Sequence, residues 1–79
     1  MFTDVLIAEI GSTTTLVSAF DGLDGEPRFL GQGQAATTVL KGDVRIGLTN
    51  AIDDLKRRLG VDWLDYGELL AASSAAGGL

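Results

Sequence analysis

The sequence contains no cysteine and no histidine among its 79 residues. These absences exclude disulfide bonds, thiol nucleophiles, zinc sites built on these side chains and triads with a histidine base within this segment. Proline occurs once, and hydrophobic residues make up 46% of the chain against 22% charged residues. This composition is typical of a globular domain rather than of a disordered segment.

Basic residues are also few, since six Lys and Arg against eleven Asp and Glu give a net charge of −5. Binding to nucleic acid requires clustered positive charge, so this balance argues against a nucleic-acid partner. No apolar run reaches the roughly 18 residues needed to span a bilayer. The first residues also lack the basic segment of a signal peptide. We therefore expect a soluble, cytoplasmic protein that binds neither nucleic acid nor a membrane.

A β-hairpin is predicted at the start of the chain. Residues 5–8 form a short apolar run that indicates a buried strand, and residues 13–20 are rich in Thr and Val, which favour a second strand. Because Gly11 and Ser12 are the turn-forming residues between these runs, we expect the two strands to pair as a tight antiparallel hairpin.

A third strand should follow the hairpin. Residues 21–27 are dense in turn-forming residues and predict a reversal of the chain. Residues 28–38 then read as a strand in which Gly31 and Gly33 indicate a bulge or a closely packed neighbour. Three consecutive antiparallel strands result.

The pattern then changes to a helical period. Apolar residues recur on one side of a helix at Val44, Leu48, Ala51, Ile52, Leu55 and Leu59. Asp43 is placed to cap the start of this helix, and Gly60 is placed to end it in a left-handed conformation. Residues 68–73 predict a fourth strand, parallel to the first. The sequence thus predicts an α/β fold.

Asp53 and Asp54 are adjacent acids on the polar side of this helix. Each precedes an arginine by four residues, so we expect the ion pairs Asp53–Arg57 and Asp54–Arg58. A pair of acids can hold a metal or serve acid–base catalysis. On the polar side of a helix it is far more often a solvated, ion-paired surface, which is the interpretation we adopt.

The turn of the hairpin carries the residues best suited to bind a phosphate. Successive backbone N–H groups in a tight turn can form an anion-binding nest, and Gly11 would let the backbone approach a phosphate closely. The hydroxyls of Ser12, Thr13 and Thr14 add hydrogen-bond donors. A carboxylate at Glu9 suits a Mg²⁺ ion bound through water. The alternative is an ordinary hairpin turn, because Gly-Ser is common in turns.

The pattern Glu9-x-Gly11-x-Thr13-Thr14 resembles the first phosphate motif of the actin, Hsp70 and sugar-kinase superfamily, which normally reads Asp-x-Gly-x-Thr. The predicted order of strands and helix matches the first half of that superfamily's domain. The resemblance implies that residues 1–79 are the N-terminal segment of an actin-like ATPase (ribonuclease H-like) domain, incomplete at the C-terminus. Residues 11–14 would bind the phosphates of ATP, and Glu9 would bind Mg²⁺.

A narrower resemblance extends over nearly the whole chain. Four segments are similar to the glutamate mutase accessory protein family (MutL/GlmL, unrelated to the mismatch-repair protein of the same name): AEIGSTTT at 8–15, GQGQAATTV at 31–39, GDVRIGL at 42–48 and ASSAAGGL at 72–79. This resemblance implies an ATP-dependent, chaperone-like factor that activates or reactivates an adenosylcobalamin-dependent mutase. The subunits of that mutase would be its partners.

Two positions depart from the superfamily pattern. Glu9 replaces the usual Asp, and Leu16 stands where relatives often carry a Lys that contacts phosphate. Two alternatives therefore stay open: a slow or nucleotide-sensing ATPase, and an interaction module that no longer hydrolyses ATP. A third is an activator of another radical enzyme, although the cysteines that such activators use for an iron–sulfur cluster are absent here. The segment alone supplies one wall of a two-lobed cleft, so we expect it to be inactive by itself.

Overall fold

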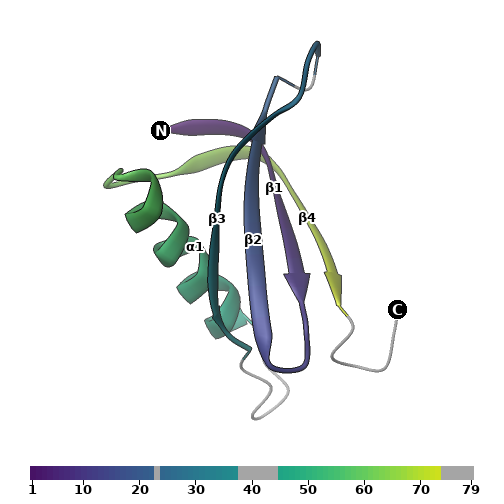
Figure 1. Cartoon of the computed structure of the whole chain (residues 1–79), viewed down its shortest axis with the longest axis vertical. Helices are drawn as coiled ribbons and strands as arrows, with labels where there is room; N and C mark the ends of the chain where they lie inside the picture. The colour runs from purple at the N-terminus through teal and green to yellow at the C-terminus, as the bar shows by residue number, and fades with distance from the viewer. Residues whose placement is uncertain (23, 38–44, 74–79) are drawn as a thin grey trace.

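A computed structural model of the chain describes residues 1–22, 24–37 and 45–73. The described elements follow one another as β1 (Phe2–Ile10), β2 (Thr14–Asp21), β3 (Arg28–Ala36), α1 (Arg45–Leu59) and β4 (Asp65–Ser73) (Figure 1). The strands form one sheet in the order β3-β2-β1-β4. β1, β2 and β3 pair as antiparallel neighbours, and β4 pairs with β1 in parallel. This arrangement confirms the predicted α/β fold of three antiparallel strands, a helix and a parallel strand.

The boundaries differ slightly from the predicted ones. β2 begins at Thr14 rather than at residue 13, and β4 begins at Asp65 rather than at residue 68. β3 ends at Ala36, and the predicted last residue of this strand, 38, lies outside the described residues. Strand pairing extends β4 because Phe2 and Asp65 already face each other in the parallel ladder.

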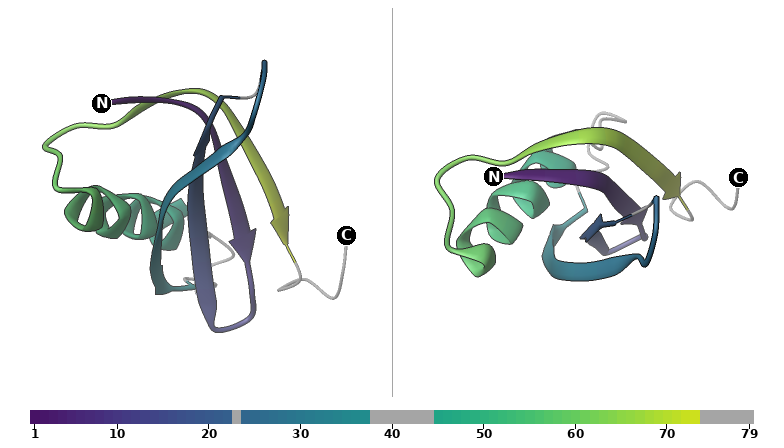
Figure 2. Two further views of the ribbon diagram at one scale, coloured as in Figure 1. Left: turned by 45° about the horizontal axis from the view of Figure 1, so that its top comes forward. Right: turned by 90° about the horizontal axis from the view of Figure 1, so that it is seen from above.

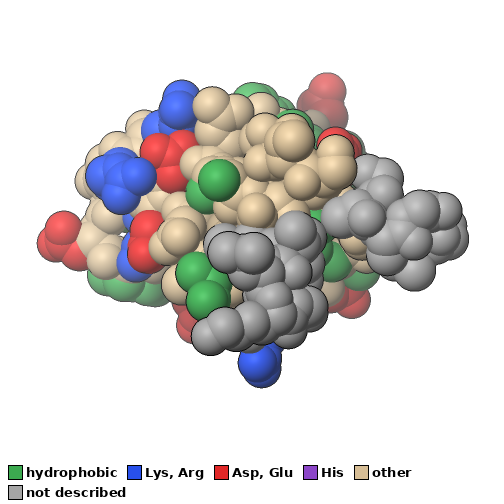
Figure 3. Space-filling view, turned by 90° about the horizontal axis from the view of Figure 1, so that it is seen from below, with side chains coloured by type: hydrophobic (Ala, Val, Ile, Leu, Met, Phe, Trp, Pro, Cys, Tyr) green, Lys and Arg blue, Asp and Glu red, His purple; other side chains and the backbone are tan. Residues whose placement is uncertain are grey.

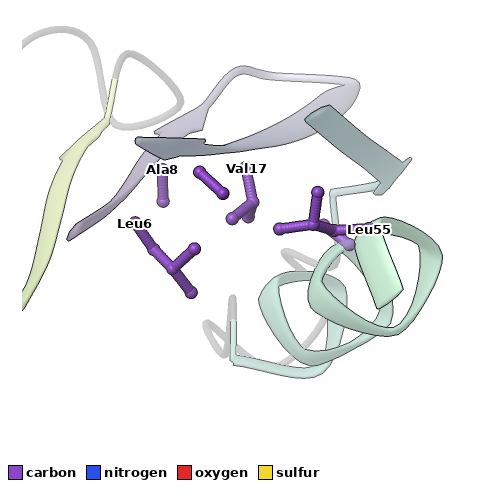
Figure 4. Close-up of a cluster of buried hydrophobic side chains, with 6 residues drawn as sticks. Leu6, Ala8, Val17 and Leu55 are labelled. Atoms are coloured by element: carbon purple, nitrogen blue, oxygen red, sulfur yellow. The ribbon is translucent and has the colours of Figure 1, made fainter. Parts of the chain in front are cut away.

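The core lies between one face of the sheet and α1. Alternation along β1 and β2 points small and medium apolar side chains to this face, and the helix contributes two more from its predicted stripe. Figure 4 shows members of this cluster, which consists of the fully buried residues Leu6, Ala8, Val17, Ala19, Ala51 and Leu55. Burying one leucine side chain contributes about 1.5–3 kcal/mol, so this cluster supplies much of what holds α1 to the sheet.

The close approach of α1 to β3 depends on two glycines. A Cβ at Gly33 would lie 2.4 Å from both the Ala51 carbonyl oxygen and the Leu55 nitrogen, which are backbone atoms of α1. A Cβ at Gly31 would meet the end of the Leu59 side chain at 2.9 Å. The predicted close neighbour of these glycines is therefore the helix.

The end of α1 is fixed by local geometry. Gly60 has a φ of 72°, and its N–H donates to the Arg57 carbonyl. The Val61 N–H donates to the Lys56 carbonyl, which completes the two-bond pattern of a glycine-terminated helix. The predicted end is confirmed, whereas the predicted cap Asp43 and the apolar Val44 lie outside the described residues. In the described part of the chain no helix has the length and apolarity needed to cross a membrane.

The opposite face of the sheet has no helix among the described residues, and α1 packs against β2 and β3 on one side only (Figure 2). Ile7 of β1, Phe29 of β3 and Leu70 of β4 are exposed on the molecule's surface, at 36%, 60% and 49%. The ring centroids of Phe20 on β2 and Phe29 on β3 lie 5.5 Å apart. α1 therefore leaves the apolar side chains of Ile7, Phe29 and Leu70 exposed.

Candidate functional site

The hairpin turn between β1 and β2 is closed by a backbone bond from the Gly11 N–H to the Thr14 carbonyl at 2.9 Å. The Gly11 N–H therefore points across the turn and closes it. A Cβ at Gly11 would lie 3.0 Å from the same Thr14 carbonyl oxygen, so glycine suits the closing position. Gly11 closes the turn, and its part in the approach to a phosphate stays a prediction.

The residues at the tip of the turn are Ser12 and Thr13, both exposed, followed by the exposed Thr14. Within residues 1–22, 24–37 and 45–73, neither the N–H groups of Ser12 and Thr13 nor the three hydroxyls have a hydrogen-bond partner. An exposed turn with several unused donors is the arrangement that an anion requires. The structure thus brings the four predicted phosphate-binding residues, 11–14, together in one turn.

The threonine that follows β3, Thr37, holds this turn from the side. The Thr37 N–H donates to the Thr13 carbonyl at 2.9 Å. The Thr37 hydroxyl lies 2.8 Å from the hydroxyl of Thr15, which is fully buried. No role for Thr37 was predicted from the sequence. One signal was available: alternation turns Thr15 inward beside Ala35, so its buried hydroxyl needs a polar partner beyond the end of β3.

Glu9 lies on the other face of β1 from the core, two residues before the turn. Its neighbours in the sheet are Leu16 on β2 and Ala72 on β4. Glu9 is exposed, and its side chain has no hydrogen bond or ion pair with any described residue. The described residues also contain no group of three or more His, Cys, Asp or Glu that could hold a metal ion. Glu9 therefore offers one carboxylate, and a cation there would complete its coordination with water or a ligand.

Both departures from the expected phosphate motif are thus side by side. Leu16 faces Glu9 directly across the antiparallel ladder, where opposed Cβ atoms are about 4.5–5.5 Å apart. A lysine at position 16 would have been an immediate neighbour of the carboxylate. With leucine there, the side chain facing Glu9 carries no charge.

Several strand ends meet near the turn. β1 and β4 run in parallel, so Ile10 and Ser73 lie opposite each other at the same edge of the sheet. β3 ends and α1 begins at this edge as well (Figure 1). Viewed from this side, charged side chains lie mostly around the periphery, and uncharged polar groups and backbone occupy much of the described centre (Figure 3). Ligands of open α/β sheets bind beyond the carboxyl ends of parallel strands, which is where the turn lies.

The sequence model of the MutL protein family matches residues 5–79. The chain belongs to this family. The match includes the turn and all five predicted site residues, Glu9, Gly11, Ser12, Thr13 and Thr14. It confirms the narrower of the two resemblances, that to the MutL family of glutamate mutase accessory proteins. A comparison with curated proteins gave no match. The actin-like ATPase assignment stays a prediction.

The acidic pair of α1 has a structural role in this MutL-family chain. The Asp54 carboxylate accepts three hydrogen bonds: from the Gln34 N–H at 2.9 Å, from Arg58 Nε at 2.7 Å and from Arg57 Nη2 at 3.2 Å. The backbone bond from Gln34, followed by that from Arg58, lowers the pKa of Asp54 to about 2. Asp54 thereby ties α1 to an outward-facing N–H of the edge strand β3.

The ion pairs follow the prediction only in part. Asp54 pairs with Arg58 as expected, but Arg57 also pairs with Asp54, and Asp53 pairs with Lys56 at 3.2 Å. The predicted Asp53–Arg57 pair is therefore replaced by pairs at a spacing of three residues. The reason is that the bond from the Gln34 N–H fixes the Asp54 carboxylate, whose side chain is only 16% exposed. In this position Arg57 and Arg58 can both reach it.

A shallow hollow of about 450 Å³ lies along the first turns of α1 in the MutL-family chain, lined by Arg45, Ile46, Thr49 and Asn50. None of the predicted site residues lines it. All four lining residues are exposed, and the hollow is wide open to solvent. The hairpin turn, rather than this hollow, is the candidate site.

Proposed function

We propose that this chain is the N-terminal segment of an actin-like ATPase domain in an accessory protein of a glutamate mutase. In this proposal residues 11–14 bind the β- and γ-phosphates of ATP, with Gly11 letting the backbone approach them, and Glu9 holds the accompanying Mg²⁺ through water. The observation that carries the proposal is the exposed hairpin tip, whose N–H and hydroxyl donors have no partner among the described residues. Membership of the MutL family supports the accessory role.

The hydrogen bonds of the turn supply only part of the free energy needed to bind ATP tightly. Hydrogen bonds to a charged group contribute about 1.5–3 kcal/mol each. Three such bonds at the lower value give about 4.5 kcal/mol, which corresponds to a dissociation constant of roughly 0.5 mM. Micromolar binding needs about 8 kcal/mol, so the adenosine and the remaining phosphate contacts must come from residues other than those of this turn.

The metal role of Glu9 fits the residues present. Mg²⁺ keeps several water ligands and typically takes one or two carboxylates together with substrate phosphates. Glu9 is one exposed carboxylate without a competing partner among the described residues. Bound Mg²⁺ would supply charge neutralisation of the phosphates, and Glu9 would place it beside the turn.

In the cell, the proposed task is to activate or reactivate an adenosylcobalamin-dependent mutase in a chaperone-like, ATP-dependent manner. The mutase subunits are the proposed partners. Family membership favours this partner over another radical enzyme, the third alternative left open by the sequence. Binding and release of nucleotide would be coupled to docking on the mutase.

The proposal is tested by isothermal titration of Mg-ATP into the intact protein. The double variant Ser12→Ala with Thr13→Ala should weaken binding at least tenfold, on the order of the loss of one charge-assisted bond. Ser18→Ala is the matched control, because Ser18 lies on the same hairpin but contacts Gln32. Equal affinities of the double variant and the wild type would contradict the proposal.

The proposed role of Glu9 in holding Mg²⁺ is tested by comparing two glutamate variants. Glu9→Gln should weaken binding of ATP in Mg²⁺ but not in EDTA, whereas Glu68→Gln should have no effect in either buffer. Glu68 is also an exposed glutamate on the sheet, paired with Val5 on β1. If both variants behave alike, Glu9 has no role in binding the metal.

A second candidate function, a nucleotide-binding or docking module without hydrolysis, is favoured by one observation. Leu16 lies directly opposite Glu9, where relatives in the proposed superfamily often carry a lysine. Phosphate release by the intact protein, measured with and without the mutase, separates the two functions. Turnover that Glu9→Ala abolishes would rule out the second candidate, and absence of turnover despite binding of ATP would favour it.

A further inference from the structure

Thr37 ties the turn to β3 through both its backbone and its side chain. Its N–H donates to the Thr13 carbonyl at 2.9 Å, at the tip of the turn. Its hydroxyl shares a hydrogen bond of 2.8 Å with Thr15, directly behind the turn. Since Thr15 is fully buried, its hydroxyl depends on Thr37 rather than on water.

The geometry of the peptide unit makes this contact a constraint on the turn. The carbonyl and the N–H of one trans peptide point in opposite directions. Holding the Thr13 carbonyl toward β3 therefore turns the Thr14 N–H toward β1, where the Thr14 carbonyl already accepts the Gly11 N–H. One side of the turn is thus fixed by Gly11 and the other by Thr37.

We infer that Thr37 is a positioning residue for the candidate phosphate site. It holds the exposed donors of Ser12 and Thr13 in one orientation, and this orientation sets the affinity for the phosphates of a nucleotide. Binding to a fixed turn avoids the entropy cost of ordering it. The inference rests on the proposed function, because it assigns a ligand to the turn.

Three variants of the intact protein test it. Thr37→Val keeps the size and the backbone N–H but removes the hydroxyl, and Thr37→Ser keeps the hydroxyl. Thr3→Val is the control for loss of a buried hydroxyl elsewhere, because Thr3 is also fully buried and donates to the Phe20 carbonyl at 2.7 Å. Thr3 lies near the start of β1, at the opposite end of the strand from the turn.

The first readout is the affinity for Mg-ATP at a temperature where every variant is folded. Thr37→Val should weaken binding roughly fivefold to tenfold, the effect of one hydrogen bond of ordinary strength. Thr37→Ser should restore wild-type affinity, and Thr3→Val should leave it unchanged. Wild-type affinity in Thr37→Val, or an equal loss in Thr3→Val, would overturn the inference while leaving the proposed function intact.

The second readout needs no nucleotide. Hydrogen exchange of the amide at position 37 reports directly on the bond to the Thr13 carbonyl. This exchange should be faster in Thr37→Val than in the wild type and unchanged in Thr3→Val. If the wild type does not bind Mg-ATP, the proposed function fails. The exchange experiment still decides the positioning role in that case: an exchange rate at position 37 that is the same in Thr37→Val and the wild type would overturn it.

Discussion

Replacement of Gly33 by alanine tests how α1 is held against the sheet. The added Cβ would lie 2.4 Å from the Ala51 carbonyl oxygen and from the Leu55 nitrogen, and 2.7 Å from the Leu55 Cα. Ordinary contacts begin near 3.4 Å, so the helix has to retreat from β3 by about 1 Å. The atoms that it meets are helix backbone, which cannot move aside as the end of a side chain does.

The cost follows from these distances. Overpacking of this kind costs about 1–3 kcal/mol, and contact with backbone places Gly33→Ala at the upper end. The smaller entropy of the unfolded alanine chain offsets about 0.4–1 kcal/mol. We therefore expect a net loss of about 2 kcal/mol, which lowers the Tm of a domain of this size by roughly 8–16 °C.

The assay is thermal and urea unfolding followed by far-UV circular dichroism, with two matched variants. Gly25→Ala is the control, because a Cβ there has no heavy atom within 4 Å. Gly31→Ala should be intermediate, since its Cβ would meet side-chain atoms of Leu59 and Leu55 rather than helix backbone. If Gly33→Ala is as stable as Gly25→Ala, glycine is not what permits the close approach of α1.

Two further predictions concern the C-terminal end of α1 and the bond that ties α1 to β3. Gly60→Ala should destabilise the fold by about 1–2 kcal/mol, because a φ of 72° is strained for a residue with a Cβ. The added Cβ would have no heavy atom within 4 Å, so the loss comes from the backbone conformation alone. Urea midpoints will measure this loss. Asp54→Asn should lower stability at pH 7 but flatten its dependence on pH. The pKa of Asp54 falls from 3.8 to about 2 on folding, so its contribution is complete above about pH 4 and is lost as the pH falls toward 2. A wild type and Asp54→Asn that lose stability in parallel between pH 4 and 2 would contradict that role.

Local patterns were sufficient for the elements of the fold. The helical stripe that includes Ala51 and Leu55 and the end of the helix at Gly60 were both predicted and are confirmed. These features depend on the period of the backbone and on the φ preference of one residue, which act within a few positions of the chain. The hairpin at Gly11 and Ser12 follows from the same kind of information.

The candidate site was predictable only as a set of residues. The motif placed Ser12, Thr13 and Thr14 in one turn, and the structure leaves their donors unpaired among the described residues. The sequence did not indicate that the Gly11 N–H closes the turn, nor that Leu16 lies opposite Glu9. Both facts depend on the register of β1 against β2. A shift of this register by one residue would give each residue a different partner across the ladder.

What the sequence by itself determined is therefore the α/β class, the order of the elements, the helix end and the chemistry of the turn. Only the tertiary structure decided that Thr37 holds Thr13, that Asp54 binds the Gln34 N–H, and that Gly33 admits the helix backbone. Each of these contacts joins residues far apart in the chain. Their distances follow from the twist of the sheet and the angle at which α1 crosses it, and no short stretch of sequence encodes either quantity.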